Sequence, residues 1–202
     1  IAAAGSVIVI ITASWLAFFA GRSRVFRGIF LLLLVTTLAL PGPLIGSLVF
    51  QLTMISSAPS WIAFFDRTIA APTLASSLFV WPVVALMVWQ VFKGTDRNLF
   101  AQAQLDGASW YRQLVSIVWS KSKGIFVGIW GIAFVLILGE LSASQMVQVA
   151  GVDTLPRLTL GLLHSGVDEK TAAVTFLTMV FGGSLTAIAF LILWSGGRRR
   201  QK

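Results

Sequence analysis

The 202-residue chain contains no cysteine, one histidine, one tyrosine and only seven acidic residues. Without cysteine it forms no disulfide bond and offers no thiolate ligand to a metal. One histidine without a neighbouring carboxylate cluster does not make a metal site, since even catalytic zinc usually takes three protein ligands. We therefore expect His164 to have a loop or packing role, and we predict no metal and no cofactor bound to this chain.

Charged residues are also scarce, at 11% of the chain, whereas soluble domains carry about 25%. Apolar residues make up 57%, and the mean hydropathy is +0.90. This composition predicts an integral membrane protein and excludes a soluble enzyme domain. The formal net charge of +8 comes from short clusters between apolar runs. Because these clusters form no basic face of a folded domain, we do not expect a nucleic-acid partner.

The apolar runs are long enough for several membrane spans, each of which needs about 20 residues. The uncharged run 28–65 allows either one crossing or a hairpin broken at Pro41-Gly42-Pro43. With one crossing, only Arg67, Arg157 and Lys170 face outward, which leaves twelve of the fifteen basic residues on the other side. So strong a bias favours five spans, with the basic side in the cytoplasm. We predict a single all-α domain over 1–202, with spans at about 1–20, 28–50, 68–92, 124–147 and 171–195 and a cytoplasmic loop at 93–123.

The chain begins at Ile1, and no basic leader precedes its first apolar run. A secretory signal would carry its basic residues ahead of such a run. We therefore expect the chain to be a fragment or the second half of a longer polypeptide.

The polar loop 93–123 contains two helical patterns. Thr95 or Asp96 is expected to cap the first helix, which runs to about Leu105, and Gly107 to supply the left-handed or otherwise strained conformation that ends it. The second pattern predicts a helix that lies along the membrane surface or against a partner. It has an apolar face of Trp110, Leu114, Ile117 and Val118, and a polar face of Arg112, Gln113 and Ser116.

The segment from Leu99 to Trp110, with Ile117 further on, resembles the cytoplasmic loop signature of the permease subunits of bacterial ABC importers. That signature reads Glu-Ala-Ala, two residues, Asp-Gly-Ala and then Ile-x-Leu-Pro. Its Glu meets Ala101 and its first Ala meets Gln102, while its closing Leu-Pro meets Trp119-Ser120. The resemblance implies an ATPase-coupling loop with Ala101, Ala103, Asp106, Gly107, Ala108, Trp110 and Ile117 as its site residues.

Two further stretches resemble the same family. Leu40 to Gly46 is similar to a Pro-Gly step in its core span, and Gly139 to Gly166 is similar to permeases for ferric iron and related small ions. The resemblance implies the five-helix core of a type I importer permease, a multi-pass protein of the bacterial inner membrane. It also implies a second permease half, cytoplasmic ATP-binding subunits, an extracytoplasmic solute-binding protein, the lipid membrane around the spans, and a ferric or similar small ion as cargo.

Glu140 is an ionisable residue inside a predicted span. Such groups are costly in a membrane and are candidates for function. We therefore consider Glu140 a candidate for the translocation path or a gate.

The chain offers no catalytic machinery of its own. None of its five lysines lies in a phosphate-binding loop Gly-x4-Gly-Lys-Ser/Thr, so ATP is expected to be bound by a partner subunit. An intramembrane enzyme would need several reactive groups at one depth, and the spans offer Glu140 alone. We predict a transport subunit without enzyme activity; a non-catalytic assembly module is the alternative.

Overall fold

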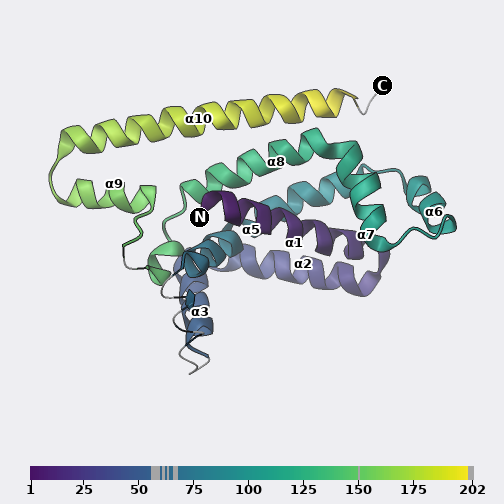
Figure 1. The fold of residues 1–202 in the computed structure, drawn as a ribbon, viewed down its shortest axis with the longest axis horizontal. Helices are drawn as coiled ribbons and strands as arrows, with labels where there is room; N and C mark the ends of the chain where they lie inside the picture. The colour runs from purple at the N-terminus through teal and green to yellow at the C-terminus, as the bar shows by residue number, and fades with distance from the viewer. Residues whose placement is uncertain (56–59, 61, 63, 66–67, 150, 200–202) are drawn as a thin grey trace.

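The computed structural model describes residues 1–55, 60, 62, 64–65, 68–149 and 151–199 (Figure 1). These residues form helices joined by turns and short loops, and no strand occurs among them. The all-helical fold class predicted from the apolar runs is therefore confirmed. The helices are α1 (Ala2–Arg22), α2 (Arg24–Ala39), α3 (Gly42–Met54), α5 (Ala70–Lys93), α6 (Arg97–Leu105), α7 (Trp110–Gln113), η1 (Leu114–Trp119), α8 (Ser120–Leu138), η2 (Ser144–Val147), α9 (Leu155–His164) and α10 (Asp168–Arg199).

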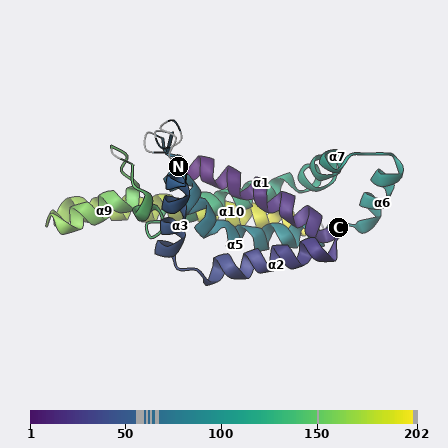
Figure 2. The ribbon, with the colours of Figure 1, turned by 90° about the horizontal axis from the view of Figure 1, so that it is seen from below.

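Helices α1, α2, α5 and α8 run side by side and form the core of the molecule (Figures 1 and 2). Helices α1 and α5 pack against each other, and both contribute small, fully buried side chains to the core, such as Ala13, Ala17, Ala85 and Val88. Small side chains let helix backbones approach closely, which is the usual way in which membrane helices associate without a hydrophobic driving force between them.

The run predicted as one span at 28–50 is divided in the structure. Helix α2 ends at Ala39, α3 begins at Gly42, and the two helices meet at 111°. Leu40 adopts an extended conformation because a residue before proline is sterically kept out of the helical region. A second proline, Pro43, then lies in the first turn of α3, where its missing N–H costs nothing.

The predicted span 124–147 also differs from the structure. Helix α8 ends at Leu138, and the chain then turns at Gly139 and forms the short 3₁₀ helix η2. The turn lies at this point because the Glu140 side chain binds the backbone that follows it, as described below. The last predicted span, 171–195, lies within the longer helix α10, which packs along α8.

Within the part of the chain that the structure describes, four helical segments are long and apolar enough to cross a membrane: Ala2–Arg22, Ala70–Lys93, Trp110–Leu138 and Asp168–Trp194. The bent pair α2–α3 provides a fifth candidate span. The chain is a multi-pass membrane protein.

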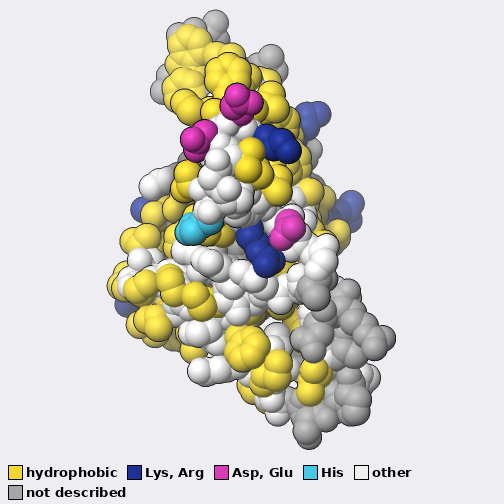
Figure 3. Space-filling view, turned by 90° about the vertical axis from the view of Figure 1, so that its left-hand side faces the viewer, with side chains coloured by type: hydrophobic (Ala, Val, Ile, Leu, Met, Phe, Trp, Pro, Cys, Tyr) yellow, Lys and Arg dark blue, Asp and Glu magenta, His cyan; other side chains and the backbone are white. Residues whose placement is uncertain are grey.

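The two ends of the bundle differ. One end carries the α1–α2 junction, α6, α7 and the last turns of α10 (Figure 1). The opposite end carries α3 and α9, and acidic and basic side chains lie there among hydrophobic ones (Figure 3). The loop 93–123 is thus at the first end, together with the basic residues of the α1–α2 junction.

Candidate functional site

The loop 93–123 begins with α6, whose first turn is capped by Asp96. The Asp96 carboxylate accepts a hydrogen bond from the backbone N–H of Asn98 at 2.9 Å. Thr95, the other candidate cap, instead donates its hydroxyl to the carbonyl of Val91 at 2.9 Å. The prediction of a capped helix ending at Leu105 is confirmed, with Asp96 as the cap.

The segment Asp106-Gly107-Ala108 ends α6 in a glycine cap. The N–H of Ala108 donates to the carbonyl of Ala103 at 2.9 Å, and the N–H of Gly107 donates to that of Gln104 at 3.0 Å. These two bonds, with Gly107 at φ +69°, are those of a Schellman motif. The left-handed conformation predicted for Gly107 is therefore confirmed. The signature residues Ala103, Asp106, Gly107 and Ala108 therefore have the spacing that this helix cap requires.

The second helix of the loop follows the predicted pattern except at two positions. Its first turn, α7, is capped by the Ser109 hydroxyl and passes into the π-helical segment η1. Gln113, assigned to the polar face, is buried with only 2% exposed, whereas Trp110, assigned to the apolar face, is 44% exposed. Both residues lie in α7, before the π-helical segment, and the difference comes from the partners that the fold brings to them: Arg22 and the Ala108 carbonyl for Gln113, and the Phe19 ring for Trp110.

Gln113 links this second helix to the end of α1. Its side-chain carbonyl accepts a hydrogen bond from the Arg22 guanidinium, and its side-chain amide donates to the Ala108 backbone carbonyl at 2.6 Å. The guanidinium of Arg22 also lies over the Phe18 ring, 4.2 Å from its centroid. Sequence reasoning missed this link because the two residues are 91 positions apart. A glutamine among apolar positions was the one available signal.

Aromatic contacts fasten the rest of the loop to α1. Phe100 of α6 packs edge-on against Phe18 at 6.2 Å between ring centroids, and Trp110 packs against Phe19 at 5.8 Å. The opposite side of the loop is open, since Leu105 is 88% exposed. The loop therefore has one side bound to the bundle and one side available to a partner.

The seven residues predicted for the coupling site fall into two groups. Six of them lie on α6, in the turn that follows it and at the first residue of α7, with Ala101 and Asp106 exposed. Ile117 is buried in η1, so the seven do not all lie on one open surface, and their role in coupling stays a prediction. The six are Ala101, Ala103, Asp106, Gly107, Ala108 and Trp110.

Glu140 lies past the far end of α8, at the opposite end of the bundle from the loop. Its side chain is 5% exposed, and its carboxyl oxygens accept four hydrogen bonds. Two come from the backbone N–H groups of Ala143 and Ser144, at 2.5 and 3.1 Å, and two from the hydroxyls of Ser142 and Ser76, each at 3.0 Å. Glu140 therefore folds the turn after α8 and ties it to α5, which carries Ser76.

The turn held by Glu140 also receives α3. A Cβ atom placed on Gly46 would lie 2.2 Å from the backbone carbonyl oxygen of Ala143. Only a residue without a side chain allows α3 to come so close to this turn. The Pro-Gly step and the Glu140 segment, which are far apart in the sequence, thus form one packed unit.

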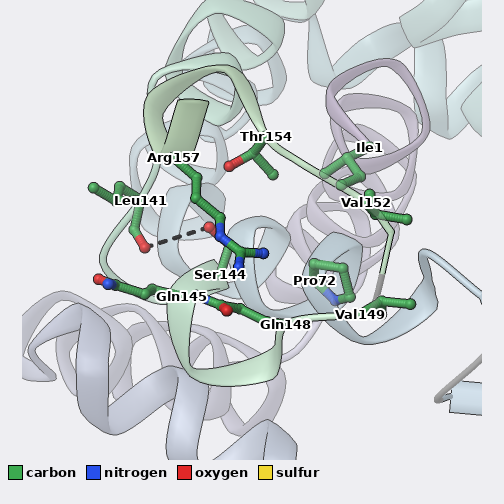
Figure 4. A pocket seen from close by; sticks show the side chains of 10 residues that line it. All are labelled: Ile1, Pro72, Leu141, Ser144, Gln145, Gln148, Val149, Val152, Thr154 and Arg157. Atoms are coloured by element: carbon green, nitrogen blue, oxygen red, sulfur yellow. Dashed lines mark hydrogen bonds between the residues drawn. The ribbon is translucent and has the colours of Figure 1, made fainter. Parts of the chain in front are cut away.

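A polar groove of about 460 Å³ lies beside this unit, between η2 and α9. Arg157 extends from α9 toward Ser144 and Gln148 (Figure 4). Its guanidinium also forms an ion pair with Asp153 at 3.4 Å. His164 lines the groove and bonds the carbonyl of Leu160 at 2.8 Å through Nδ1. Among the described residues, no group of three or more His, Cys, Asp or Glu side chains is arranged to hold a metal ion.

Similarity to known proteins extends along most of the chain. Two curated relatives, both putrescine transport system permease proteins named PotI, come from Escherichia coli strains K12 and O6:H1. Each is 26% identical over 181 residues, which cover 89% of this chain and 63% of the relative. The similarity supports the ABC importer permease family. No protein-family model matches the chain.

The match to these permeases leaves part of their length uncovered, since the chain spans about 63% of it. The helical bundle and the similarity together place the protein in the bacterial inner membrane as a multi-pass protein. The ferric-iron type predicted from Gly139 to Gly166 is not supported, because both relatives are named for putrescine.

Proposed function

We propose that this chain is a transmembrane subunit of an ATP-driven importer, where it forms half of the translocation path. The similarity to transport permeases over 89% of the chain carries the proposal. The loop at one end of the bundle supports it, because its open side suits a soluble partner while its other side is joined to α1. The partner is an ATP-binding subunit, since this sequence has no phosphate-binding loop.

The charge distribution supports a cytoplasmic location for the loop. The α1–α2 junction, the loop and the last turns of α10 lie at the same end of the bundle, and they carry most of the basic residues (Figure 1). In membrane proteins the basic ends of spans stay in the cytoplasm. The groove between η2 and α9 then faces the opposite side, toward an extracytoplasmic solute-binding protein.

Single cysteines in this cysteine-free chain test the orientation. Ser120 and Ser165 suit the test because both are exposed, and Ser23 and Ser60 add a second position at each end. Ser122 does not suit it, since its side chain is buried. We expect an impermeant thiol reagent to label positions 60 and 165 in intact cells, and positions 23 and 120 only after permeabilisation. Labelling of position 120 in intact cells would overturn the orientation.

Capture of the ATP-binding subunit tests the transport role. The tagged full-length protein is purified from its own host in mild detergent, and the proteins retained with it are identified by mass spectrometry. We expect a nucleotide-binding subunit and a second permease half. If the protein is purified intact without any nucleotide-binding subunit, the assembly-module alternative is favoured.

For the cargo we propose a small cation, a class that includes both the predicted ferric ion and the putrescine named for the relatives. Uptake of labelled putrescine and of ferric iron is compared between a deletion strain and the same strain carrying the gene. We expect the gene to restore uptake of one of the two. Restoration of neither, with growth on thiamine or molybdate affected instead, would overturn the proposal.

A further inference from the structure

A cavity of about 550 Å³ lies among the ends of α1, α2 and α5 and the side of α6. Three cationic residues line it, one from each of the three longer helices: Arg22, Arg27 and Lys93. No Asp or Glu belongs to its described lining. The nearby Asp96 is engaged as the cap of α6. The cavity is therefore strongly positive.

The three cations have partners, but none of these partners is a carboxylate. The Arg22 guanidinium stacks over Phe18, and the Lys93 ammonium lies 5.6 Å from the Trp89 ring centroid. The Arg27 Nε donates to the Ala20 carbonyl, at the end of α1, at 3.4 Å. Aromatic faces and a carbonyl orient these groups without neutralising them, so their charge remains available to an anion.

The depth of the cavity favours a membrane ligand. Arg22 ends α1, Lys93 ends α5, and Arg27 lies in the first turn of α2, so all three lie where candidate spans end. This is the level of the lipid headgroups. Basic pockets between transmembrane helices at this level can hold anionic headgroups.

An apolar path leads away from the cavity along α2. Leu31 forms part of the lining and is 48% exposed. Val35 and Leu38, at 60% and 61% exposed, follow it at helical spacing on the same face. A free phosphate would not need such a stripe, whereas the acyl chain of a lipid would cover it.

We propose that this cavity binds the headgroup of an anionic phospholipid, with an acyl chain along Leu31, Val35 and Leu38 of α2. The headgroup phosphate lies between Arg27 and Lys93 and meets Arg22, which also holds Gln113 of the loop. The site is independent of the transport role, since it needs only the membrane location of the bundle.

Native mass spectrometry of the delipidated full-length protein tests the site. Dioleoyl phosphatidylglycerol and dioleoyl phosphatidylcholine, which share acyl chains, are titrated separately. We expect tighter binding of phosphatidylglycerol, and roughly fivefold weaker binding for each cation lost in Arg27→Gln/Lys93→Gln. The matched control is Lys121→Gln/Lys123→Gln, which removes the same charge from exposed positions at the start of α8, outside the cavity.

Three results would overturn the proposal. Equal losses in the two double variants would indicate diffuse attraction to a basic surface. Equal binding of the two lipids would exclude headgroup recognition. Displacement of phosphatidylglycerol by an equal concentration of glycerol 3-phosphate would indicate a site for a free phosphate. If the Arg27/Lys93 variant does not purify as a folded protein, Lys93→Gln and Leu31→Gln are measured instead, and each is expected to weaken phosphatidylglycerol binding.

Discussion

The two ends of α8 are held to the bundle in different ways. At the Glu140 end, one buried carboxyl group accepts four hydrogen bonds, and α3 packs directly on the backbone of the same turn. At the loop end, aromatic rings and the Arg22–Gln113 link make the attachment, and most of the described loop residues are exposed. The first arrangement leaves little freedom to move. The second has fewer buried hydrogen bonds, which suits the coupling role proposed for the loop.

Removing the Glu140 carboxyl group is expected to have the largest effect on stability. In Glu140→Leu, the buried N–H groups of Ala143 and Ser144 lose their acceptor. Each unsatisfied group costs about 1–3 kcal/mol, so we expect a loss of about 2–6 kcal/mol. The loss is measured as the change in the free energy of unfolding of the purified protein in detergent. Glu140→Gln keeps one acceptor oxygen and should lose less, and Glu169→Leu at the exposed start of α10 should lose little. Equal stability of the Leu and Gln variants would contradict the assigned role.

Adding one methyl group at Gly46 is expected to have the next largest effect. The added Cβ atom would lie 2.2 Å from the Ala143 carbonyl oxygen. This oxygen belongs to the backbone, so it cannot move aside by a rotamer change as a side chain could. We expect Gly46→Ala to lose about 1–3 kcal/mol, as overpacking usually does. Gly28→Ala on α2 is the control, because nothing lies within 4 Å of its Cβ. Similar melting temperatures for the two variants would show that α3 does not pack on this turn.

Gln113→Leu is expected to weaken the attachment of the loop to α1. It removes the hydrogen bonds of the Gln113 side chain with Arg22 and with the Ala108 carbonyl. We expect a loss of stability of about 1 kcal/mol, which is smaller than that of Glu140→Leu. Spin labels at Ser23 and Tyr111 report the distance between the α1–α2 junction and α7. We expect a narrow distance distribution in the parent protein and a broad one in Gln113→Leu.

The control for this change is Gln102→Leu, at an exposed position on α6. It should leave the distribution narrow. An unchanged distribution in Gln113→Leu would mean that the aromatic contacts alone hold the loop.

Gly107→Val is expected to have a small effect on stability and its main effect on transport. Nothing lies within 4 Å of its Cβ, so the cost is only that of a left-handed backbone, about 1–2 kcal/mol. We expect normal membrane levels with loss of the captured ATP-binding subunit, or ATP hydrolysis no longer linked to uptake. Asparagine tolerates a positive φ better than valine does, so Gly107→Asn should retain more function than Gly107→Val. Normal transport by the Gly107→Val variant would indicate that the loop is an ordinary turn without a coupling role.

Much of this molecule follows from the sequence alone. Uncharged runs of helical length determine a helical membrane protein, because a bilayer leaves few other ways to satisfy the backbone. The Asp96 cap and the Gly107 turn could be predicted because each depends on residues within a few positions. The composition could not reveal how the parts of the site meet.

Only the tertiary structure decided the rest. Gln113 is buried because Arg22, which lies 91 residues away in the sequence, donates a hydrogen bond to it. The sequence indicated that Glu140 is an isolated charge within a span. In the structure it lies beyond the end of α8, where hydrogen-bond donors from its own turn and from Ser76 surround its carboxyl group. The cavity at Arg22, Arg27 and Lys93 likewise exists only because three helix ends converge. Local patterns report a residue's periodicity and its near neighbours, whereas burial of a polar side chain depends on which distant donors and acceptors the packed helices bring to it.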